Sequence, residues 1–168
     1  MRNHRRSQFL LSSKIKSLDA LAKEITRLKN NGSVVVFTNG CFDILHYGHA
    51  QYLQSAKNKG DILVVAVNSD SSIKKIKGRN RPIVDQKNRL GLLSALSCID
   101  YLTLFNDETP LKVIRRVKPD ILVKGADWKK SSIVGSDFVK SYGGRVLTVK
   151  LVKGLSTTNL IKRIVKTH

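Results

Sequence analysis

Two histidines, His46 and His49, stand three residues apart just beyond a run of β-branched residues, with Gly40 and Gly48 close by. At the start of a helix this spacing projects both imidazoles from one face. Free backbone N–H groups and the positive end of the helix dipole favour phosphate there. Imidazoles add directed donors that can follow charge as it builds on a phosphoryl group. Glycine permits a sharp turn at residue 40 and a close ligand approach at residue 48. Ordinary surface caps and, less favoured, a metal site are the alternatives.

A second group of candidate phosphate ligands lies near the C-terminus. Gly154 is followed by Ser156, Thr157 and Thr158, directly before the last helical pattern. Glycine and hydroxyl residues at a helix start present N–H and O–H donors to an anion. Simple helix capping would use the same residues.

A cationic run covers residues 74–82, in a polar stretch that is expected to be a loop. Such a run is usually solvated and mobile, but next to a triphosphate it would act as a lid. Lys77, beside a glycine, is the cation expected to do so. Asp85 and Arg89 follow at helical i, i+4 spacing, which suits a structural ion pair as well as a site.

A fourth candidate segment contains Lys124, Asp127 and Trp128, at the end of an expected strand. The carboxylate suits a sugar hydroxyl, a ribose or a magnesium ion, and the indole suits the wall of a pocket. A buried tryptophan with a capping aspartate is the alternative.

These residues are positioned by elements whose apolar period switches repeatedly between helix and strand. Strands are expected at residues 34–38, 61–67, 101–105, 121–123 and 146–151. Helices are expected between Ser17 and Gly32, over 46–59, after Asp85, through 110–117, over 132–142 and after Ser156. The alternation predicts an α/β fold, a Rossmann-like doubly wound parallel sheet with helices on both faces. In such a sheet, ligands bind beyond the carboxyl ends of the strands.

Composition restricts the class of protein. The 168 residues, 41% hydrophobic, favour one domain with a real core, here 14–168 after a basic extension at 1–13. Lys and Arg number 31 against 12 Asp and Glu, a net charge of +19, which indicates an anionic partner. Two distant cysteines argue against a disulfide framework or a zinc site. No apolar run is long enough to span a membrane, and a cytoplasmic protein is expected.

The segment GCFDILHYGH, residues 40–49, resembles the signature of the HxGH nucleotidyltransferase superfamily. Similarity extends over roughly residues 14 to 165, including GDILVVAVNSD, KGRNRPI, KGADW and GLSTT. These stretches resemble the adenylyltransferase part of the ADP-heptose synthase family, often fused to a sugar kinase for which this chain has no room. The resemblance therefore implies the stand-alone form. Ala126 departs from a glycine usual in the family, which puts the sugar specificity in doubt.

The resemblance implies that a sugar 1-phosphate, D-glycero-β-D-manno-heptose 1-phosphate, attacks the α-phosphorus of ATP and releases pyrophosphate. Because a sugar phosphate is already ionised, no general base is required, and Mg²⁺ is expected with the ATP. His46, His49 and Lys77 would be catalytic. The nucleotide-binding residues would be Asn39, Gly40, Cys41, Phe42, Gly48, Gly154, Ser156, Thr157 and Thr158. The substrate-binding residues would be Asn68, Asp70, Arg89, Lys124, Asp127 and Trp128. No metal ligand from the protein is assigned.

Two other functions stay open. A cytidylyltransferase acting on glycerol 3-phosphate would share the chemistry. A basic nucleic-acid-binding module would explain the charge, but the cations are scattered, aromatics make up only 6%, and no nucleic-acid-reading motif is present. Nucleic acid is therefore not expected as the main ligand. A P-loop NTPase or a nicotinamide dehydrogenase is not expected, because the sequence lacks the glycine-rich fingerprint of either class. Cys41, at a phosphate-rich turn, could have a lowered pKa but is interpreted as a packing residue. The resemblance also implies a homodimer or higher assembly.

Overall fold

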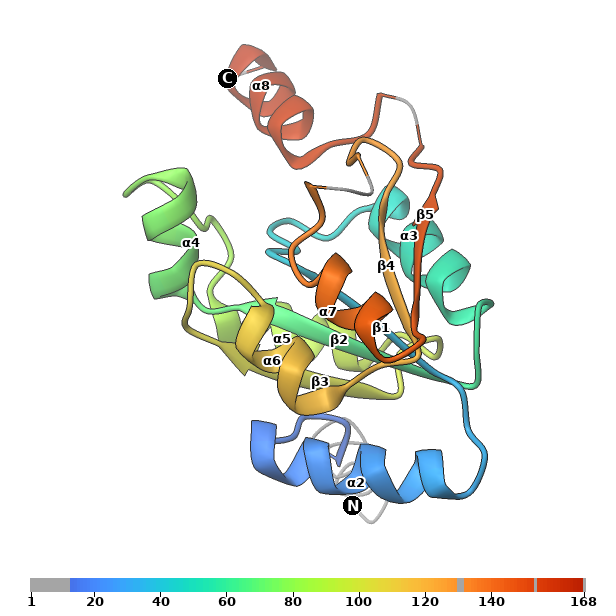
Figure 1. Cartoon of the computed structure of the whole chain (residues 1–168). Coiled ribbons are helices and arrows are strands. Elements are labelled where there is room, and N and C mark those ends of the chain that lie inside the picture. The colour runs from blue at the N-terminus through green and yellow to red at the C-terminus, as the bar shows by residue number, and fades with distance from the viewer. Residues whose placement is uncertain (1–12, 130–131, 153, 168) are drawn as a thin grey trace, which may run out of the picture.

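A five-stranded parallel sheet forms the centre of the computed structural model, which describes residues 13–129, 132–152 and 154–167. The strands are β1 (Val35–Gly40), β2 (Ile62–Asn68), β3 (Tyr101–Phe105), β4 (Ile121–Gly125) and β5 (Arg145–Val149). They lie in the order β3-β2-β1-β4-β5 (Figure 1). Within the sheet, the chain passes from β1 outward to β3 and then returns to β4 on the other side of β1. This reversal opens a crevice at the carboxyl ends of β1 and β4, where ligands bind in such sheets.

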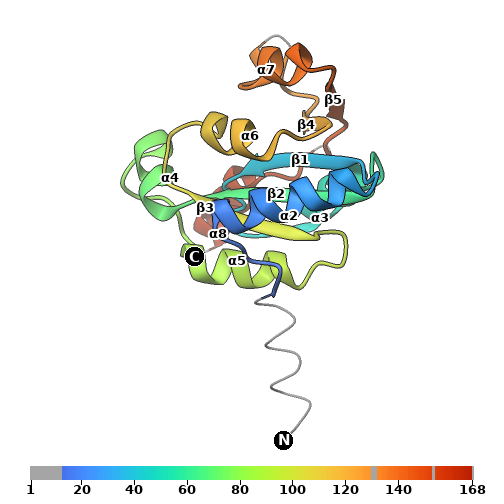
Figure 2. The same ribbon diagram turned by 60° about the horizontal axis from the view of Figure 1, so that its bottom comes forward.

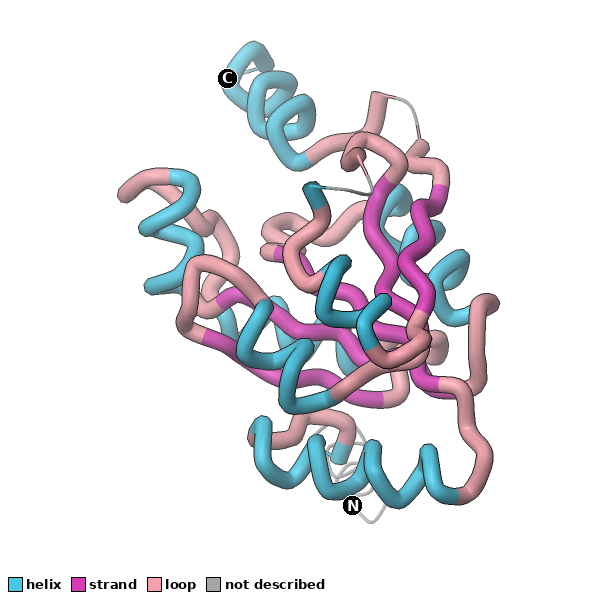
Figure 3. Tube along the Cα trace, in the orientation of Figure 1, coloured by secondary structure: helices cyan, strands magenta, loops and turns pink. Residues whose placement is uncertain are grey.

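Helices cover both faces of the sheet and alternate with the strands along the chain (Figure 3). One apolar core joins the sheet to α3 (Tyr47–Lys57) and α5 (Gln86–Ser94). The other joins it to α2 (Leu18–Asn30), α6 (Leu111–Val117) and α7 (Ser136–Ser141). Figure 2 shows α5 and α6 on opposite sides of the sheet. The predicted doubly wound α/β fold is therefore confirmed.

The central strands are apolar throughout because both of their faces are buried. In β2, Leu63 and Val65 belong to the core on the α3 side, whereas Val64 and Ala66 belong to the core on the α2 side. The register places Val64 opposite Phe37 of β1. Such continuous burial explains why the apolar runs predicted these strands correctly.

Polar side chains start several helices as predicted. Ser17 accepts a hydrogen bond from the backbone N–H of Ala20, and Asp85 accepts one from Asn88. These bonds satisfy N–H groups that have no partner within the helix. The helix predicted over 132–142 is shorter, because Gly135 takes a left-handed φ of 86° directly before α7 begins.

The polar stretch that was predicted to be a loop contains a helix, α4 (Asp70–Lys77). Ser69 caps it, accepting a hydrogen bond from the Ser72 N–H at 3.1 Å. Only Ser72 and Ile73 of this helix are buried. The sequence therefore lacks the repeated apolar residues from which a helix is predicted. The last helix, α8 (Thr157–Thr167), buries no residue, and both helices stand apart from the sheet in Figure 1.

Candidate active site

A cavity of about 350 Å³ opens at the carboxyl ends of β1 and β4, the position expected from the strand order. The turn after β1, the start of α3, the turn after β4 and the start of α8 supply most of its lining. Predicted site residues on its wall are Asn39, Gly40, Cys41, Phe42, His46, Gly48, His49, Lys77, Lys124, Asp127, Trp128, Ser156, Thr157 and Thr158. The structure thus gathers segments that lie more than 100 residues apart in the sequence.

The imidazole rings of His46 and His49 stack in this cavity, with centroids 3.9 Å apart and planes inclined by 28°. His46 stands at the N-cap of α3 and makes no side-chain capping bond. The Nδ1 atoms of both rings are buried without a hydrogen-bond partner. Burial lowers the pKa of His46, and burial together with His46 and Lys77 lowers the pKa of His49 to about 4. Both rings are therefore neutral near pH 7 and keep polar atoms free for a ligand.

Two glycines pack closely against aromatic rings at this turn. A Cβ on Gly48 would lie 3.0 Å from Cε1 and Nδ1 of His46, and a Cβ on Gly40 would lie 3.1 Å from the ring of Phe42. Phe42 and Ile44 both adopt a left-handed φ of 49°, which is strained for residues with a side chain. Tight packing and strain at this turn are typical of a functional site.

Asp43 holds the same turn in place. Its carboxylate is 1% exposed, pairs with Arg81 at 2.8 Å, and accepts the N–H groups of Ile83 and Val84. Its carbonyl oxygen accepts the hydroxyl of Thr157 at 2.8 Å. Asp43 therefore joins the β1 turn to the loop after α4 and to the start of α8.

Lys124 is a half-buried cation that also lines the cavity. Its Nζ donates to the carbonyl of Asn39 at 3.1 Å and lies 5.7 Å from the ring centroid of Trp128. Burial lowers the pKa of Lys124 to about 8, an effect that Asp127 partly opposes. The indole is 48% exposed, so the alternative of a buried tryptophan is wrong. Lys124 retains donor capacity for an anion in the cavity.

The comparisons with known proteins agree with this geometry. The family model described as cytidylyltransferase-like matches residues 37–166, from within β1 into α8. The chain belongs to the cytidylyltransferase-like family. The predicted superfamily and the predicted enzyme class, a nucleotidyltransferase, are thereby confirmed.

Relatives of this cytidylyltransferase-like chain include two proteins named bifunctional protein HldE. The one from Geobacter metallireducens is 51% identical over 156 residues, which is 93% of this chain and 32% of the relative. The one from Helicobacter pylori is 51% identical over 148 residues, 88% of this chain and 31% of the relative. The chain thus spans about a third of the length of these relatives.

Two solved structures resemble it. The lipopolysaccharide core biosynthesis protein from Thermoplasma volcanium is 35% identical, with a TM-score of 0.60, over 73% of this chain and 98% of that one. A pantothenate synthetase from Thermus thermophilus is 17% identical, with a TM-score of 0.63, over 87% of this chain and 66% of that one. This likeness shows the fold alone.

Within the described residues, no helix has the length and apolar character needed to cross a membrane.

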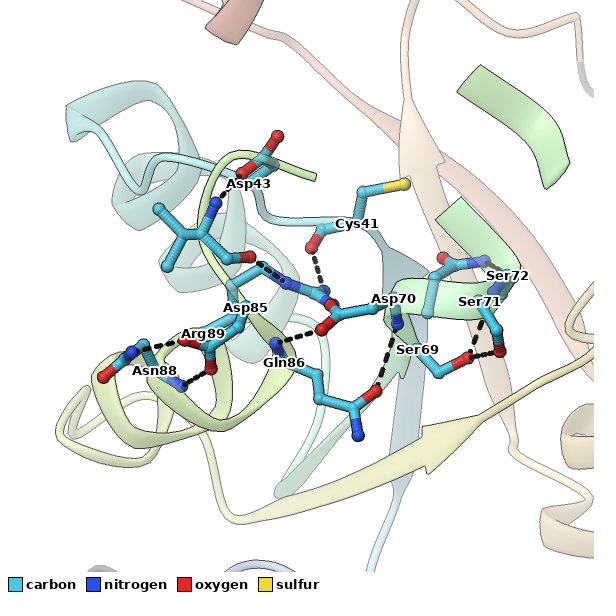
Figure 4. Close-up of polar contacts among 12 residues, drawn as sticks. Cys41, Asp43, Ser69, Asp70, Ser71, Ser72, Asp85, Gln86, Asn88 and Arg89 are labelled. Atoms are coloured by element: carbon cyan, nitrogen blue, oxygen red, sulfur yellow. Dashed lines mark hydrogen bonds and ion pairs between the residues drawn. The ribbon is translucent and has the colours of Figure 1, made fainter. Parts of the chain in front are cut away.

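Four predicted site residues of this cytidylyltransferase-like chain lie outside the cavity lining: Asn68, Asp70, Arg89 and Gly154. Asn68 is buried and donates to Ser72, and Arg89 pairs with Asp70 at 2.7 Å (Figure 4). The predicted ion pair between Asp85 and Arg89 does not form, because Asp85 caps α5 instead. Nucleotide contact by Gly154 and substrate contact by the other three stay predictions.

Sequence reasoning missed six lining residues: Asp43, Tyr52, Gly125, Leu151, Val152 and Leu155. Asp43 lies within the HxGH signature, which was the available signal. The Tyr52 hydroxyl lies 2.6 Å from Thr38 Oγ1, and burial raises the pKa of Tyr52 to about 12, so it stays protonated. For Cys41 the suggestion of a lowered pKa is wrong, because burial raises the pKa of its thiol.

Proposed function

We propose that this chain transfers AMP from ATP to a sugar 1-phosphate, D-glycero-β-D-manno-heptose 1-phosphate, giving ADP-heptose and pyrophosphate. The stacked pair of His46 and His49, with unpaired Nδ1 atoms at the start of α3, carries the proposal. The name of the Thermoplasma volcanium protein and the similarity to the HldE proteins support a sugar phosphate as the acceptor.

In this reaction an oxygen of the sugar phosphate attacks the α-phosphorus of ATP in line. The bond from the α-phosphorus to its bridging oxygen breaks, and pyrophosphate leaves. The acceptor is ionised at pH 7, so the cavity needs to position the reactants and stabilise negative charge rather than remove a proton. His46 and His49 donate to the phosphoryl oxygens, and Lys77 neutralises charge on the leaving pyrophosphate.

The remaining walls of the cavity hold the two substrates. Residues 39–42, with Gly48, frame the nucleotide. The hydroxyls at the start of α8 face the triphosphate, although Thr157 already donates to Asp43 and Ser156 accepts the Asn159 N–H at 3.1 Å. Lys124, Asp127 and Trp128 bind the sugar phosphate.

Magnesium fits this site as a companion of the triphosphate. Among the described residues, no three His, Cys, Asp or Glu side chains gather into a group that holds a metal ion. The cavity instead offers hydroxyls, imidazoles and lysines, which suit phosphate oxygens. Magnesium retains waters and takes few protein ligands beside phosphates, so the phosphate oxygens would hold it and no protein side chain is assigned to it. When bound, the ion neutralises charge on the phosphate oxygens.

Pyrophosphate release tests the proposal. ATP and CTP are each combined with Mg²⁺ and with both anomers of heptose 1-phosphate or with glycerol 3-phosphate. The doubly substituted His46→Ala, His49→Ala protein is the control for a contaminating enzyme. We expect release only with ATP and one heptose 1-phosphate. Release with CTP and glycerol 3-phosphate would keep the nucleotidyl transfer but assign it to these two substrates. No release from the folded protein would refute the transfer. A cytoplasmic location and a homodimer or higher homo-oligomer stay predictions.

A further inference from the structure

The segment that carries Lys77, residues 70–84, is attached at both ends to the turn after β1. At its start, Asp70 pairs with Arg89 at 2.7 Å, and Arg89 Nη1 donates to the carbonyl of Cys41 at 2.6 Å. At its end, the N–H groups of Ile83 and Val84 donate to the carboxylate of Asp43, the next residue but one in the same turn. We call residues 70–84 the Lys77 segment.

Arg89 is the centre of this attachment. Its side chain is 1% exposed, and each of its three nitrogens donates a hydrogen bond: Nε to the carbonyl of Val84, Nη1 to Cys41 and Nη2 to Asp70 (Figure 4). The second carboxylate oxygen of Asp70 accepts the N–H of Gln86 at 3.1 Å. One planar guanidinium therefore fixes both ends of the Lys77 segment against the β1 turn, with a geometry that an ammonium cannot reproduce.

Apart from these anchors, the helix that bears Lys77 is held only near its start, where the Ser72 hydroxyl accepts a bond from Asn68 and donates to the carbonyl of Asp107. Only Ser72 and Ile73 of α4 are buried, and residues 74–80 are exposed. Lys77 nevertheless lines the cavity, and its positive charge helps to lower the pKa of His49. With so little packing, the position of Lys77 relative to the histidines depends on the anchors at the two ends of the segment.

We propose, on the basis of the proposed function, that Arg89 is a positioning residue for the transfer: it sets where Lys77 stands relative to His49 and touches no substrate. This replaces the substrate contact that the sequence predicted for Arg89 with an indirect role. It also gives Asp70 a function, since that carboxylate is the link between Arg89 and α4.

The first readout is kinetic. Arg89→Lys keeps the positive charge but loses the three-way donation, and we expect kcat to fall by about 10- to 100-fold, as for a small misplacement of a catalytic group. In a Lys77→Ala background the same substitution should lower kcat by less than about twofold, since coupled sites are not additive. Asp85→Ala removes the cap of the same helix, outside the attachment. It should leave kcat unchanged and lower stability by about 1 kcal/mol.

The second readout needs no turnover. The titration of the His49 imidazole, followed by NMR, should move to higher pH in Lys77→Ala, because a nearby cation is lost. Arg89→Lys should cause a shift in the same direction in the wild-type background and none in the Lys77→Ala background. If Arg89→Lys fails to fold, Asp70→Asn, whose side chain is 30% exposed, tests the same link and should give the same shifts.

The outcomes separate the two proposals. An unchanged His49 titration in Arg89→Lys, or a loss of kcat that multiplies with that of Lys77→Ala, would overturn the positioning role. If the variants show the expected NMR shifts but the wild-type protein releases no pyrophosphate, the proposed function is overturned instead.

Discussion

The rings of His46 and His49 stack with centroids 3.9 Å apart, and the ring of Phe42 packs against His49 in a T-shaped arrangement with centroids 5.5 Å apart. Two imidazoles this close cannot both carry a proton cheaply, and burial adds to the cost. The free protein therefore presents two neutral donors on one side of the cavity. An incoming phosphate favours protonation of the pair, so the site is matched to an anion whose charge grows during the reaction.

Replacing either histidine should remove catalysis without unfolding the protein. For His46→Ala and for His49→Ala we expect kcat to fall by about 100- to 1,000-fold, the typical effect of one lost transition-state donor. Pyrophosphate release measures the loss and circular dichroism the fold. Tyr47→Ala, on the 66% exposed neighbour of these residues, is the matched control and should keep normal turnover. Near-normal kcat in a histidine variant would remove that residue from the mechanism.

The stability of the protein should fall in mild acid because of His49. Its pKa is lowered to about 4, below the unfolded value of 6.5, so the unfolded chain binds more protons between these two pH values. The free energy of unfolding should decrease by about 2 kcal/mol as the pH falls from 6.5 to 4, after allowance for the partial exposure of the ring. Urea unfolding at several pH values measures this, and His49→Asn should flatten the dependence. An equal slope in wild type and variant would contradict the assignment.

Gly48 should be more important for activity than for stability. In Gly48→Ala the new methyl group presses on His46 at 3.0 Å and shifts the ring. We expect kcat to drop about tenfold, since small misplacements are costly in an active site. Gly91→Ala, on α5 with nothing within 4 Å of the added Cβ, is the matched control. It should raise stability by up to about 1 kcal/mol with unchanged activity. Equal turnover in the two variants would show that the space beside His46 is not needed.

Lys124 should bind the sugar phosphate as a cation. Its pKa of about 8 means that the free protein loses this charge as the pH rises through 8. The KM for the sugar phosphate should therefore increase above pH 8. In Lys124→Met it should be raised by about 10-fold or more at pH 7, the cost of one charged hydrogen bond, and the pH dependence should disappear. Lys150→Met, on an exposed lysine beyond β5, controls for net charge. An equal increase of the KM in Lys124→Met and Lys150→Met would exclude a direct contact of Lys124 with the sugar phosphate.

The sequence predicted those parts of the molecule whose causes are local. The runs at 34–38 and 61–67 became β1 and β2 because continuous apolar, largely β-branched residues suit strands buried on both faces. Ser17, Asp85 and Ser156 cap helices through a bond to a residue three positions on, which a sequence shows directly.

The features that the sequence did not predict, helix α4 and the role of Asp43, depend on contacts between residues far apart in the chain. Helix α4 has almost no apolar face, and its start is fixed by Arg89, 19 residues away. The role of Asp43 depends on N–H groups 40 and 41 residues away and on the hydroxyl of Thr157, 114 residues away. No local period signals such bonds, so the contacts by which Arg89 and Asp43 connect the parts of the site became visible only in the structure.

Labelled ATP tests the central claim most directly. The protein is incubated with heptose 1-phosphate, Mg²⁺ and ATP carrying radioactive phosphorus at the α position or, in a parallel reaction, at the γ position. The account predicts that α label appears in ADP-heptose and γ label in pyrophosphate, and that both signals vanish in the double histidine variant. Transfer of γ label to the sugar, or no labelled sugar at all from folded wild-type protein, would contradict it.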